Sequence, residues 1–433
     1  MITVLLFVLG VVVFAVGVAV SIGLHEVGHM VPAKKFGVKV TQYFVGFGRT
    51  VWSTHRGETE YGLKAIPLGG YVKLVGMLPP AKDDPLGRPR QSNTGMFTQL
   101  ISDARHAEAE LIKPGDEERL FYRLPWWKKV IVMAGGPTVN LVIAFLLFAG
   151  IFGIYGVPEP TTTVQSVSEC VITAEEQPRK CTAEDEASPA AEAGIRPGDR
   201  IVSFNDQPID SWDQVVQLIR SNDDGRAAIV VERGGQELTL ETSTTVNLVR
   251  SLEDREVIVE DGFLGVTPTA VREQQGLLYT GEQMGVMTWD VTQALVRLPV
   301  KVFDVAQAVV GLEERADDSP VSIVGAGRVA GEVTSDQTSP AVDRLVFLVG
   351  LLASLNLFVG MFNFIPLLPL DGGHIAGALY EGLRRGVARV RGRPDPGFVD
   401  VAKLLPVAYV VGASLLVMGL ILITADIVVP IQV

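Results

Sequence analysis

The sequence has few of the residues and motifs that mark several common classes of protein. It contains only two cysteines, Cys170 and Cys181, which are too few for a structural zinc site. It has no Gly-x-x-x-x-Gly-Lys-Ser/Thr phosphate loop and no internal repeat of the kind that many transporters carry. Its first apolar run lacks the basic residues and the small-residue cleavage site of a secretory leader. We therefore expect that run to remain as a membrane helix.

Apolar residues, in contrast, make up 48% of the 433 residues. Because a membrane helix needs about 20 consecutive apolar residues, runs of that length are candidate membrane spans. Trp126 and Trp127, followed by two lysines, are typical of an anchor at the membrane interface. The sequence predicts a multi-pass α-helical membrane protein with four transmembrane helices, at 1–30, 126–154, 344–372 and 403–425.

Charge is distributed unevenly along the chain. Loops that carry Lys and Arg close to the membrane usually face the cytoplasm, which applies here to Lys34, Lys35, Lys39, Lys128, Lys129, Arg384, Arg385, Arg389, Arg391 and Arg393. The stretch from Phe152 to Asp343 is strongly acidic, and we expect it to lie outside the cytoplasm. Its charge therefore gives no reason to expect a nucleic acid partner. Both cysteines fall in this stretch, and an oxidising compartment favours a disulfide over two unpaired thiols.

The end of the first apolar run carries three ionisable residues, His25, Glu26 and His29. On a helix the two histidines lie one turn apart on one face with the glutamate beside them, which is the arrangement that a catalytic zinc needs. Ionisable groups in hydrocarbon cost several kcal/mol unless they pair or bind a metal. The alternative, two solvated histidines on a soluble helix, conflicts with the apolar context. The pattern predicts a functional site at membrane depth.

A catalytic zinc needs a third protein ligand and an open position for water. The third span ends in the segment 363–374, which reads Asn-Phe-Ile-Pro-Leu-Leu-Pro-Leu-Asp-Gly-Gly-His. This places the Asp371 carboxylate at the same cytoplasmic level as His25. The amide of Asn140 in the second span is a further polar group within an apolar run.

Between the first two spans, segment 38–76 is rich in β-formers and glycine, and segment 77–125 is polar. The first predicts strands at Val38–Val45, Thr50–His55, Glu60–Ala65 and Gly70–Leu74, joined as successive hairpins. A sheet beside the motif helix would offer an edge to an extended peptide, although an ordinary cytoplasmic β-subdomain fits equally well. The polar segment shows little periodicity from residue 79 onward, which is typical of a mobile insertion.

Segment 159–269 has the pattern of a soluble α/β domain. It predicts a helix at Trp212–Arg220 and a hairpin around Gly234-Gly235. The block from Ala190 to Asn205 resembles a bacterial PDZ domain, and Gly262-Phe263-Leu264-Gly265 looks like the carboxylate-binding loop of a circularly permuted PDZ. A plain strand and turn is the alternative. Segment 283–333 predicts two amphipathic helices, on the outer membrane surface or against the core.

Taken together, these motifs resemble the site-2 protease family of intramembrane zinc metalloproteases. The likeness rests on His-Glu-x-x-His in the first span and Asn-x-x-Pro-x-x-x-Leu-Asp-Gly at the third, with Gly69-Gly70-Tyr71-Val72-Lys73 similar to the family's membrane re-entrant β-sheet. The PDZ insert between spans two and three marks the bacterial branch that cleaves anti-sigma factors. We find one PDZ domain here, where some members carry two.

The resemblance implies one Zn²⁺ per chain, held by His25, His29 and Asp371, with Glu26 as general base. It implies substrate-binding roles for Asn363, Asn140, Gly70, Tyr71 and the loop Gly262–Gly265. His374 is expected to be structural, because three ligands suffice. The implied substrates are single-span membrane proteins such as anti-sigma factors, trimmed first by an upstream site-1 protease. The implied location is the bacterial cell membrane, with the active site near the cytoplasmic side and the PDZ domain outside.

Two other functions remain open from the sequence alone. One is a membrane-anchored zinc protease that acts on soluble or misfolded proteins. The other is a non-catalytic PDZ scaffold that retains zinc-binding residues without activity. A transporter is a weaker third, since only four spans are predicted.

Overall fold

The computed structural model describes residues 2–80, 96–174, 176, 179–251 and 257–431. The chain divides into two compact units. Unit 1 comprises residues 1–154 and 276–433, and unit 2 comprises residues 155–275.

Four helices of unit 1 are long and apolar enough to cross a membrane, among the residues that the structure describes. They are α1 (Ile2–Lys35), α3 (Trp126–Gly150), α8 (Ala341–Asn363) and α10 (Leu405–Val428). A short π-helical turn, η2 (Ile151–Tyr155), follows α3, and η3 (Val401–Leu404) precedes α10. These helices lie where the apolar runs predict spans. The largest difference is in the third span, predicted at 344–372: α8 ends at Asn363, and Asp371 belongs to the next helix.

Glycines allow α1 and α3 to pack with their backbones in contact. A Cβ added to Gly135 would lie 1.9 Å from the carbonyl oxygen of Gly28, so no larger residue fits this crossing. Close approach of this kind is typical of membrane helices, which associate through small residues. The contact places the start of α3 directly beside the His-Glu-x-x-His turn of α1.

The β-rich segment 38–76 forms one hairpin of two long strands, β1 (Val40–Arg56) and β2 (Thr59–Leu74). The four predicted runs lie in these strands except for Val38 and Lys39, which precede β1, but the prediction of successive hairpins was wrong. The reason is that most of the glycines do not form turns. Three glycines with positive φ lie inside the strands, where the pairing register is irregular: Gly46, Gly48 and Gly69. Irregularities of this type bend a strand without ending it.

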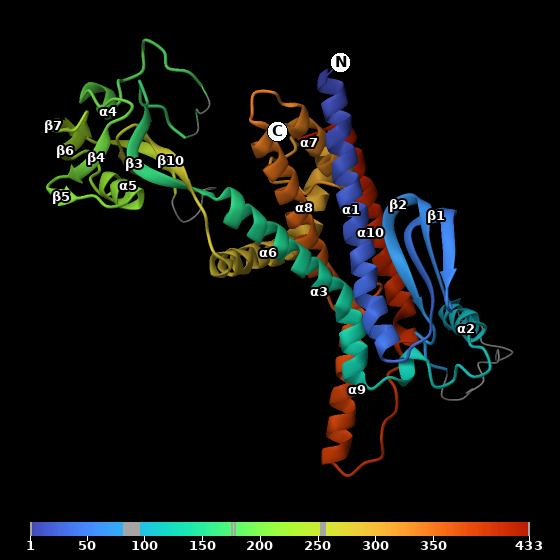
Figure 1. Cartoon of the computed structure of the whole chain (residues 1–433). Coiled ribbons are helices and arrows are strands. Elements are labelled where there is room, and N and C mark those ends of the chain that lie inside the picture. The colour runs from blue at the N-terminus through green and yellow to red at the C-terminus, as the bar shows by residue number, and fades with distance from the viewer. Residues whose placement is uncertain (1, 81–95, 175, 177–178, 252–256, 432–433) are drawn as a thin grey trace. The chain divides into compact units, whose positions relative to one another are not determined.

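The bend in the two strands folds the sheet back on itself. Val45 pairs with both Gly70 and Leu63, so the last part of β2 lies on one side of β1 and the first part on the other. Figure 1 shows the hairpin beside α1. The last part of β2 thereby lies against α1, where Gly70 is in contact with Ile22 and Glu26.

The polar segment 77–125 contains more regular structure than its sequence predicts. It includes α2 (Met96–Ala109) and a short 3-10 helix, η1 (Phe121–Arg123), while residues 81–95 lie outside the described part. Contacts with distant parts of unit 1 hold α2: the Glu108 carboxylate accepts the backbone N–H groups of Gly76 and Met77, at 2.6 and 2.9 Å. Arg105 donates to Asp400 at 2.6 Å. Tertiary contacts of this kind leave little periodic signal in the sequence.

Segment 276–335 forms two helices, α6 (Leu277–Val309) and α7 (Ile323–Ser335). Both were predicted, although α6 begins six residues before the predicted segment 283–333. The α7 helix packs closely on α1, since a Cβ at Gly331 would lie 2.7 Å from the Phe7 ring. The prediction left open whether these helices lie on the outer membrane surface or against the core, and α7 packs against the core.

The helix α9 (Asp371–Val390) was not predicted. It begins at the Asp of the predicted Asn-x-x-Pro-x-x-x-Leu-Asp-Gly motif and packs beside the start of α3, with Gly382 against the Trp126 ring. In Figure 1 it extends beyond the first turn of α3. Its arginines Arg384, Arg385 and Arg389 were predicted to lie in a basic loop, not in a helix.

Unit 2 has its own hydrophobic core beneath a mostly antiparallel sheet of order β10-β3-β4-β6-β7. Its elements are β3 (Val157–Val167), α4 (Pro189–Glu192), β4 (Arg200–Phe204), β5 (Gln207–Pro208), α5 (Trp212–Arg220), β6 (Arg226–Arg233), β7 (Gln236–Ser243), β8 (Thr245–Arg250), β9 (Ile258–Phe263) and β10 (Val266–Glu273). The bounds of α5 and the hairpin turn at Gly234-Gly235 match the prediction. The predicted disulfide between Cys170 and Cys181 is present.

Candidate active site

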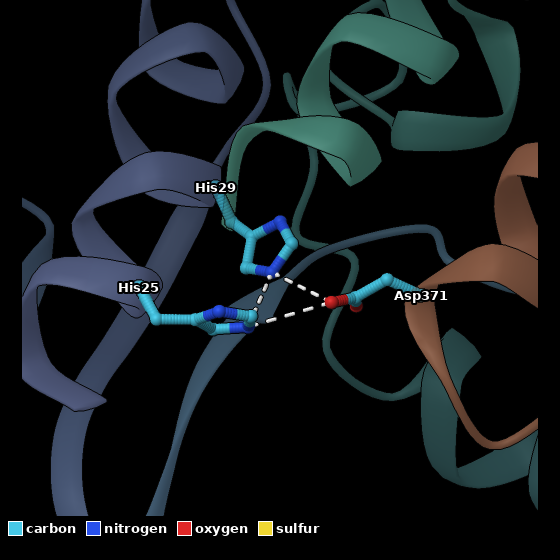
Figure 2. A group of neighbouring side chains, drawn as sticks. All are labelled: His25, His29 and Asp371. Carbon is cyan, nitrogen blue, oxygen red and sulfur yellow. Dashed lines mark hydrogen bonds and ion pairs between the residues drawn. The ribbon is translucent and has the colours of Figure 1, made fainter. Parts of the chain in front are cut away.

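Three side chains that lie far apart in the sequence of unit 1 meet at the His-Glu-x-x-His turn of α1. His25 and His29 lie one turn apart on α1, and Asp371 is the first residue of α9. Figure 2 shows the two imidazoles and the carboxylate turned toward one point. One ligand atom from each residue lies within 4.8 Å of the others, which makes this a group that can hold a metal ion.

The spacing of the three ligand atoms fits a tetrahedral zinc ion. The Nε2 atoms of His25 and His29 are 3.2 Å apart, and they lie 3.4 and 3.3 Å from Oδ2 of Asp371. Ligand atoms about 2.0–2.1 Å from a tetrahedral zinc are about 3.3 Å from one another. The donor set of two imidazoles and one carboxylate also leaves a fourth position open, as catalytic zinc sites do.

The orientation of His29 is fixed by the backbone of α3. Its Nδ1 lies 2.8 Å from the carbonyl oxygen of Val132, to which it donates. A histidine that donates from one ring nitrogen presents the lone pair of the other, so Nε2 faces the metal position. His25 Nδ1 is buried and has no partner in the described part of the chain. Of the two imidazoles, the His29 ring is therefore oriented by a hydrogen bond from Nδ1, and the His25 ring is not.

Glu26 lies beside this group on the wall of a partly open cavity. A cavity of about 230 Å³ is lined by His25, Glu26, Gly69, Gly70, Asn140 and Asn363, together with Val18, Ser21, Ile22, Leu355, Asn356 and Val359. A Cβ at Gly70 would lie 3.0 Å from Cγ of Glu26. A carboxylate within reach of the metal position and facing a cavity is placed for proton transfer.

The two predicted amides, Asn140 and Asn363, both line this cavity from opposite helices, α3 and α8. Asn140 is 3% exposed, and its Oδ1 has no hydrogen-bond partner among the described residues. Asn363 donates from Nδ2 to the Val359 carbonyl at 3.1 Å. The structure therefore brings both amides to the same space as Glu26.

The other predicted substrate-binding residues are placed differently. Gly70 lines the cavity, whereas the Tyr71 ring stacks on Phe44 with centroids 5.6 Å apart. The loop Gly262–Gly265 belongs to unit 2, where it joins β9 to β10. His374 lies outside the three-residue group and lines a separate small cavity with Lys129 and Glu381.

Two polar residues of the cavity were missed from the sequence. Ser21 lies one turn before His25 on α1, and Asn356 lies on α8, where it donates to the Ser21 hydroxyl at 3.0 Å. The signal that singled out Asn140, an amide in an apolar span, applies equally to Asn356. The Gly136 backbone was read only as a helix contact, yet a Cβ there would lie 2.3 Å from Nε2 of His29.

The fold and the site together define a helical membrane protein with a three-ligand metal centre and a neighbouring carboxylate. The sequence profile of "Peptidase family M50" matches residues 13–394. The chain belongs to this family, the site-2 protease family, and is a zinc metalloprotease of the site-2 type.

Relatives match over nearly the whole chain. The "Zinc metalloprotease Rip1" of Mycobacterium tuberculosis is 34% identical over 443 residues, which cover 99% of each chain. Rip1 of Mycolicibacterium smegmatis is 33% identical over 99% of this chain and 100% of its own. The "Metalloprotease MmpA" of Caulobacter vibrioides is 28% identical and covers 88% of this chain and 86% of its own. The resemblance drawn from the motifs is thereby confirmed, and so is zinc as the metal of the family.

Proposed function

We propose that this protein hydrolyses a peptide bond within or near the transmembrane segment of single-span membrane proteins. One observation carries the proposal above the others. The nitrogen atoms of His25 and His29 and the Asp371 carboxylate lie 3.2 to 3.4 Å apart at the end of a helix long enough to span a membrane. Ligands at that depth serve a substrate that also lies in the membrane.

The three ligands and Glu26 have different roles in this proposal. His25, His29 and Asp371 hold zinc, which when bound supplies a Lewis acid and lowers the pKa of water in the site toward 7. Glu26, 9% exposed, takes the proton as the water attacks the peptide carbonyl and then donates it to the leaving amine. Asn363 and Asn140 hold the substrate backbone or the developing oxyanion, since both amides face the same cavity.

A transmembrane helix must unwind before it can be cut, because its peptide bonds are protected by internal hydrogen bonds. Gly69 and Gly70 offer the strand backbone of β2 at the cavity wall, beside Glu26. A larger and mainly apolar cavity of about 830 Å³ shares Leu355 and Val359 with the active-site cavity. An apolar segment lying in the larger space would therefore be next to the catalytic residues. Tyr71 contributes through its backbone, because its ring packs on Phe44.

We assign the site to the cytoplasmic side of a bacterial cell membrane, with unit 2 outside. Lys34 and Lys35 end α1, and Lys128 lies in the first turn of α3, which fits the rule that Lys and Arg close to the ends of membrane helices face the cytoplasm. The Cys170–Cys181 disulfide in unit 2 supports an oxidising compartment for that unit.

We further assign unit 2 as a PDZ domain that acts on a trimmed substrate. The strand β10 lies at the edge of its sheet, where a peptide can add a strand. The Leu264 carbonyl accepts the Ala190 N–H at 2.9 Å. In a planar trans peptide the carbonyl and the following N–H point in opposite directions, so the Gly265 N–H faces away from Ala190. A loop N–H of this kind can bind a terminal carboxylate left by a first, extracytoplasmic protease. The substrate class of anti-sigma factors rests on the family resemblance.

The test is cleavage of candidate single-span proteins in membranes by wild type and by Glu26→Gln. We expect the substitution to lower the rate about 10²- to 10⁴-fold while zinc remains bound. Glu58→Gln is the matched control, because Glu58 is exposed and paired with Arg119. Equal cleavage by wild type and Glu26→Gln would favour the scaffold function. Glu26-dependent cleavage of soluble proteins alone would favour the membrane-anchored protease that acts on misfolded chains.

A further inference from the structure

Asn356 is the most deeply buried polar side chain of the active-site cavity. It lies on α8 and is 1% exposed. Its Nδ2 donates to the Leu352 carbonyl at 2.8 Å and to the Ser21 hydroxyl at 3.0 Å. Its Oδ1 is buried and has no partner anywhere in the described ranges. The side chain lines the cavity, and its hydrogen-bonding capacity is only half satisfied.

The assignment of nitrogen and oxygen in this amide is fixed by its neighbours. The Leu352 carbonyl can only accept, so the Asn356 atom facing it at 2.8 Å has to be the donor, Nδ2. Rotation of the amide would place two oxygens against each other. The free atom is therefore a carbonyl-type acceptor, suited to an N–H group.

An acceptor of this kind fits the substrate that the proposed function requires. An unwound segment in the membrane exposes backbone N–H groups that water cannot reach, and each one left unpaired costs free energy. Asn140, which lines the same cavity, carries a second buried and unpartnered Oδ1. The cavity thus holds two side-chain acceptors, and both lack donors within the described chain.

The place of Asn356 along the cavity follows from helix geometry. Ser21, its partner, lies four residues before His25 on α1, which is about 6 Å along the helix axis. Asn356 likewise precedes Asn363 on α8. An extended peptide advances about 3.3 Å per residue, so about 6 Å corresponds to about two residues. Both helices put Asn356 on the same side of the metal centre, toward the start of α1.

We infer that Asn356 is a substrate-binding residue whose Oδ1 accepts a backbone N–H of the unwound substrate, about two residues from the scissile bond on the side of the start of α1. This inference rests on the proposed function and adds a subsite to it. The competing role is a structural one, in which Asn356 only ties α8 to α1 through Ser21. The two roles make opposite predictions for Ser21.

The first experiment compares Asn356→Leu with Ser21→Ala in the full chain. The probe is a single-span fusion protein, with a transmembrane segment of about 20 residues containing Gly and Ser, that wild type cuts and Glu26→Gln does not. We expect Asn356→Leu to lower kcat/KM roughly 10- to 100-fold, because a substrate N–H is left unpaired. Ser21→Ala leaves Oδ1 in place and should stay within about 3-fold of wild type. Equal losses in both variants would overturn the inference in favour of a helix contact.

The second experiment removes the N–H from the substrate. Proline, which has no backbone N–H, is placed at each position of the probe in turn, and every probe is cut by wild type and by Asn356→Leu. We expect one position at which proline slows wild type but has no further effect on the variant. Effects that multiply at every position would overturn the inference. Failure of wild type to cut any probe in a Glu26-dependent way would overturn the proposed function itself.

Discussion

A methyl group added to Gly136 of α3 would lie 2.3 Å from Nε2 of His29, so the α3 backbone forms one wall of the metal centre. The same methyl would lie 2.7 Å from Nε2 of His25. Because both imidazoles would have to move, we expect Gly136→Ala to weaken zinc binding about 10- to 100-fold and to abolish cleavage. Zinc per chain, measured on purified protein by mass spectrometry, checks this.

The same helix offers a matched control at Gly150, where an added Cβ meets nothing within 4 Å. Gly150→Ala should retain zinc and activity at wild-type levels, since it changes helix propensity in the same way without touching the site. Full zinc content in Gly136→Ala would contradict the packing of α3 against the imidazoles.

A second prediction separates Asp371 from the neighbouring His374. We expect Asp371→Ala to lose zinc, because two imidazoles alone do not complete a three-ligand site. His374→Ala should keep zinc, since His374 lies outside the ligand group. Removal of zinc with a chelator should abolish cleavage in the wild type, and added Zn²⁺ should restore it. Zinc loss in His374→Ala with zinc retained in Asp371→Ala would reverse the assignment of the third ligand.

The metal centre was within reach of the sequence because each half carries its own signal. His25 and His29 share one helix turn inside an apolar run, and Asp371 follows a Pro-containing motif at the end of another. The four long helices were also predictable, because each one is a local run of apolar residues. In unit 2, the alternation of apolar and polar residues predicted the hairpin at Gly234-Gly235.

Other features depend on contacts that no local pattern encodes. The helix α9 begins Asp-Gly-Gly, and glycine disfavours helices by about 1 kcal/mol per residue. Its glycines serve packing instead: a Cβ at Gly372 would lie 2.1 Å from the Ile365 carbonyl oxygen. The bends in β1 and β2 likewise arise at glycines that read as turns. Asn356 was missed although it obeys the rule that found Asn140.

The third prediction concerns a buried ion pair between α3 and α9. Nζ of Lys129 lies 2.7 Å from Oε2 of Glu381, and the two side chains are 7% and 2% exposed. Removing one partner leaves a buried charge, which costs about 3–5 kcal/mol. Arg385 also contacts Glu381, at 3.3 Å, so Lys129→Met should fall near the lower end of that range. Thermal unfolding in detergent measures the loss.

Replacing both partners should recover much of that stability, because Lys129→Met with Glu381→Met removes both buried charges and Arg385 keeps its contact with Asp395 at 3.5 Å. Arg123→Met is the control, since the Arg123–Glu118 pair is 39% and 90% exposed and contributes little. A double variant less stable than Lys129→Met alone would contradict this expectation and would show that Glu381 stabilises the protein through its other partners, Arg385 and the Val399 N–H.

The last prediction concerns the acid stability of unit 2. Arg233 donates two hydrogen bonds to the Asp199 carboxylate, both at 2.7 Å, and Asp199 is fully buried. The Arg233 guanidinium, aided by the Arg196 backbone N–H, holds the pKa of Asp199 below its ordinary value. An acid with a lowered pKa in the folded state binds fewer protons than the unfolded chain does. Its contribution to stability is therefore complete above about pH 4 and is lost as the pH falls further.

Arg233→Met removes the cause of the lowered pKa. We expect this variant to be less stable than wild type at pH 7 and to lose less additional stability between pH 5 and pH 2. Residues 155–275 form a unit with its own core, and Trp212, the only tryptophan in that range, packs against it. Urea unfolding of this segment, followed by Trp212 fluorescence at each pH, gives the free energy of unfolding.

Arg200→Met is the matched control, because Arg200 pairs with Glu232 at an exposed position in the same unit. Exposed pairs contribute little, so this variant should follow the wild-type pH curve. If Arg233→Met instead parallels the wild type from pH 7 to pH 2, the Asp199 carboxylate is not the group whose protonation destabilises unit 2 in acid. An Arg200→Met curve as shallow as that of Arg233→Met would attribute the effect to net charge, since both variants remove one positive charge from the same domain.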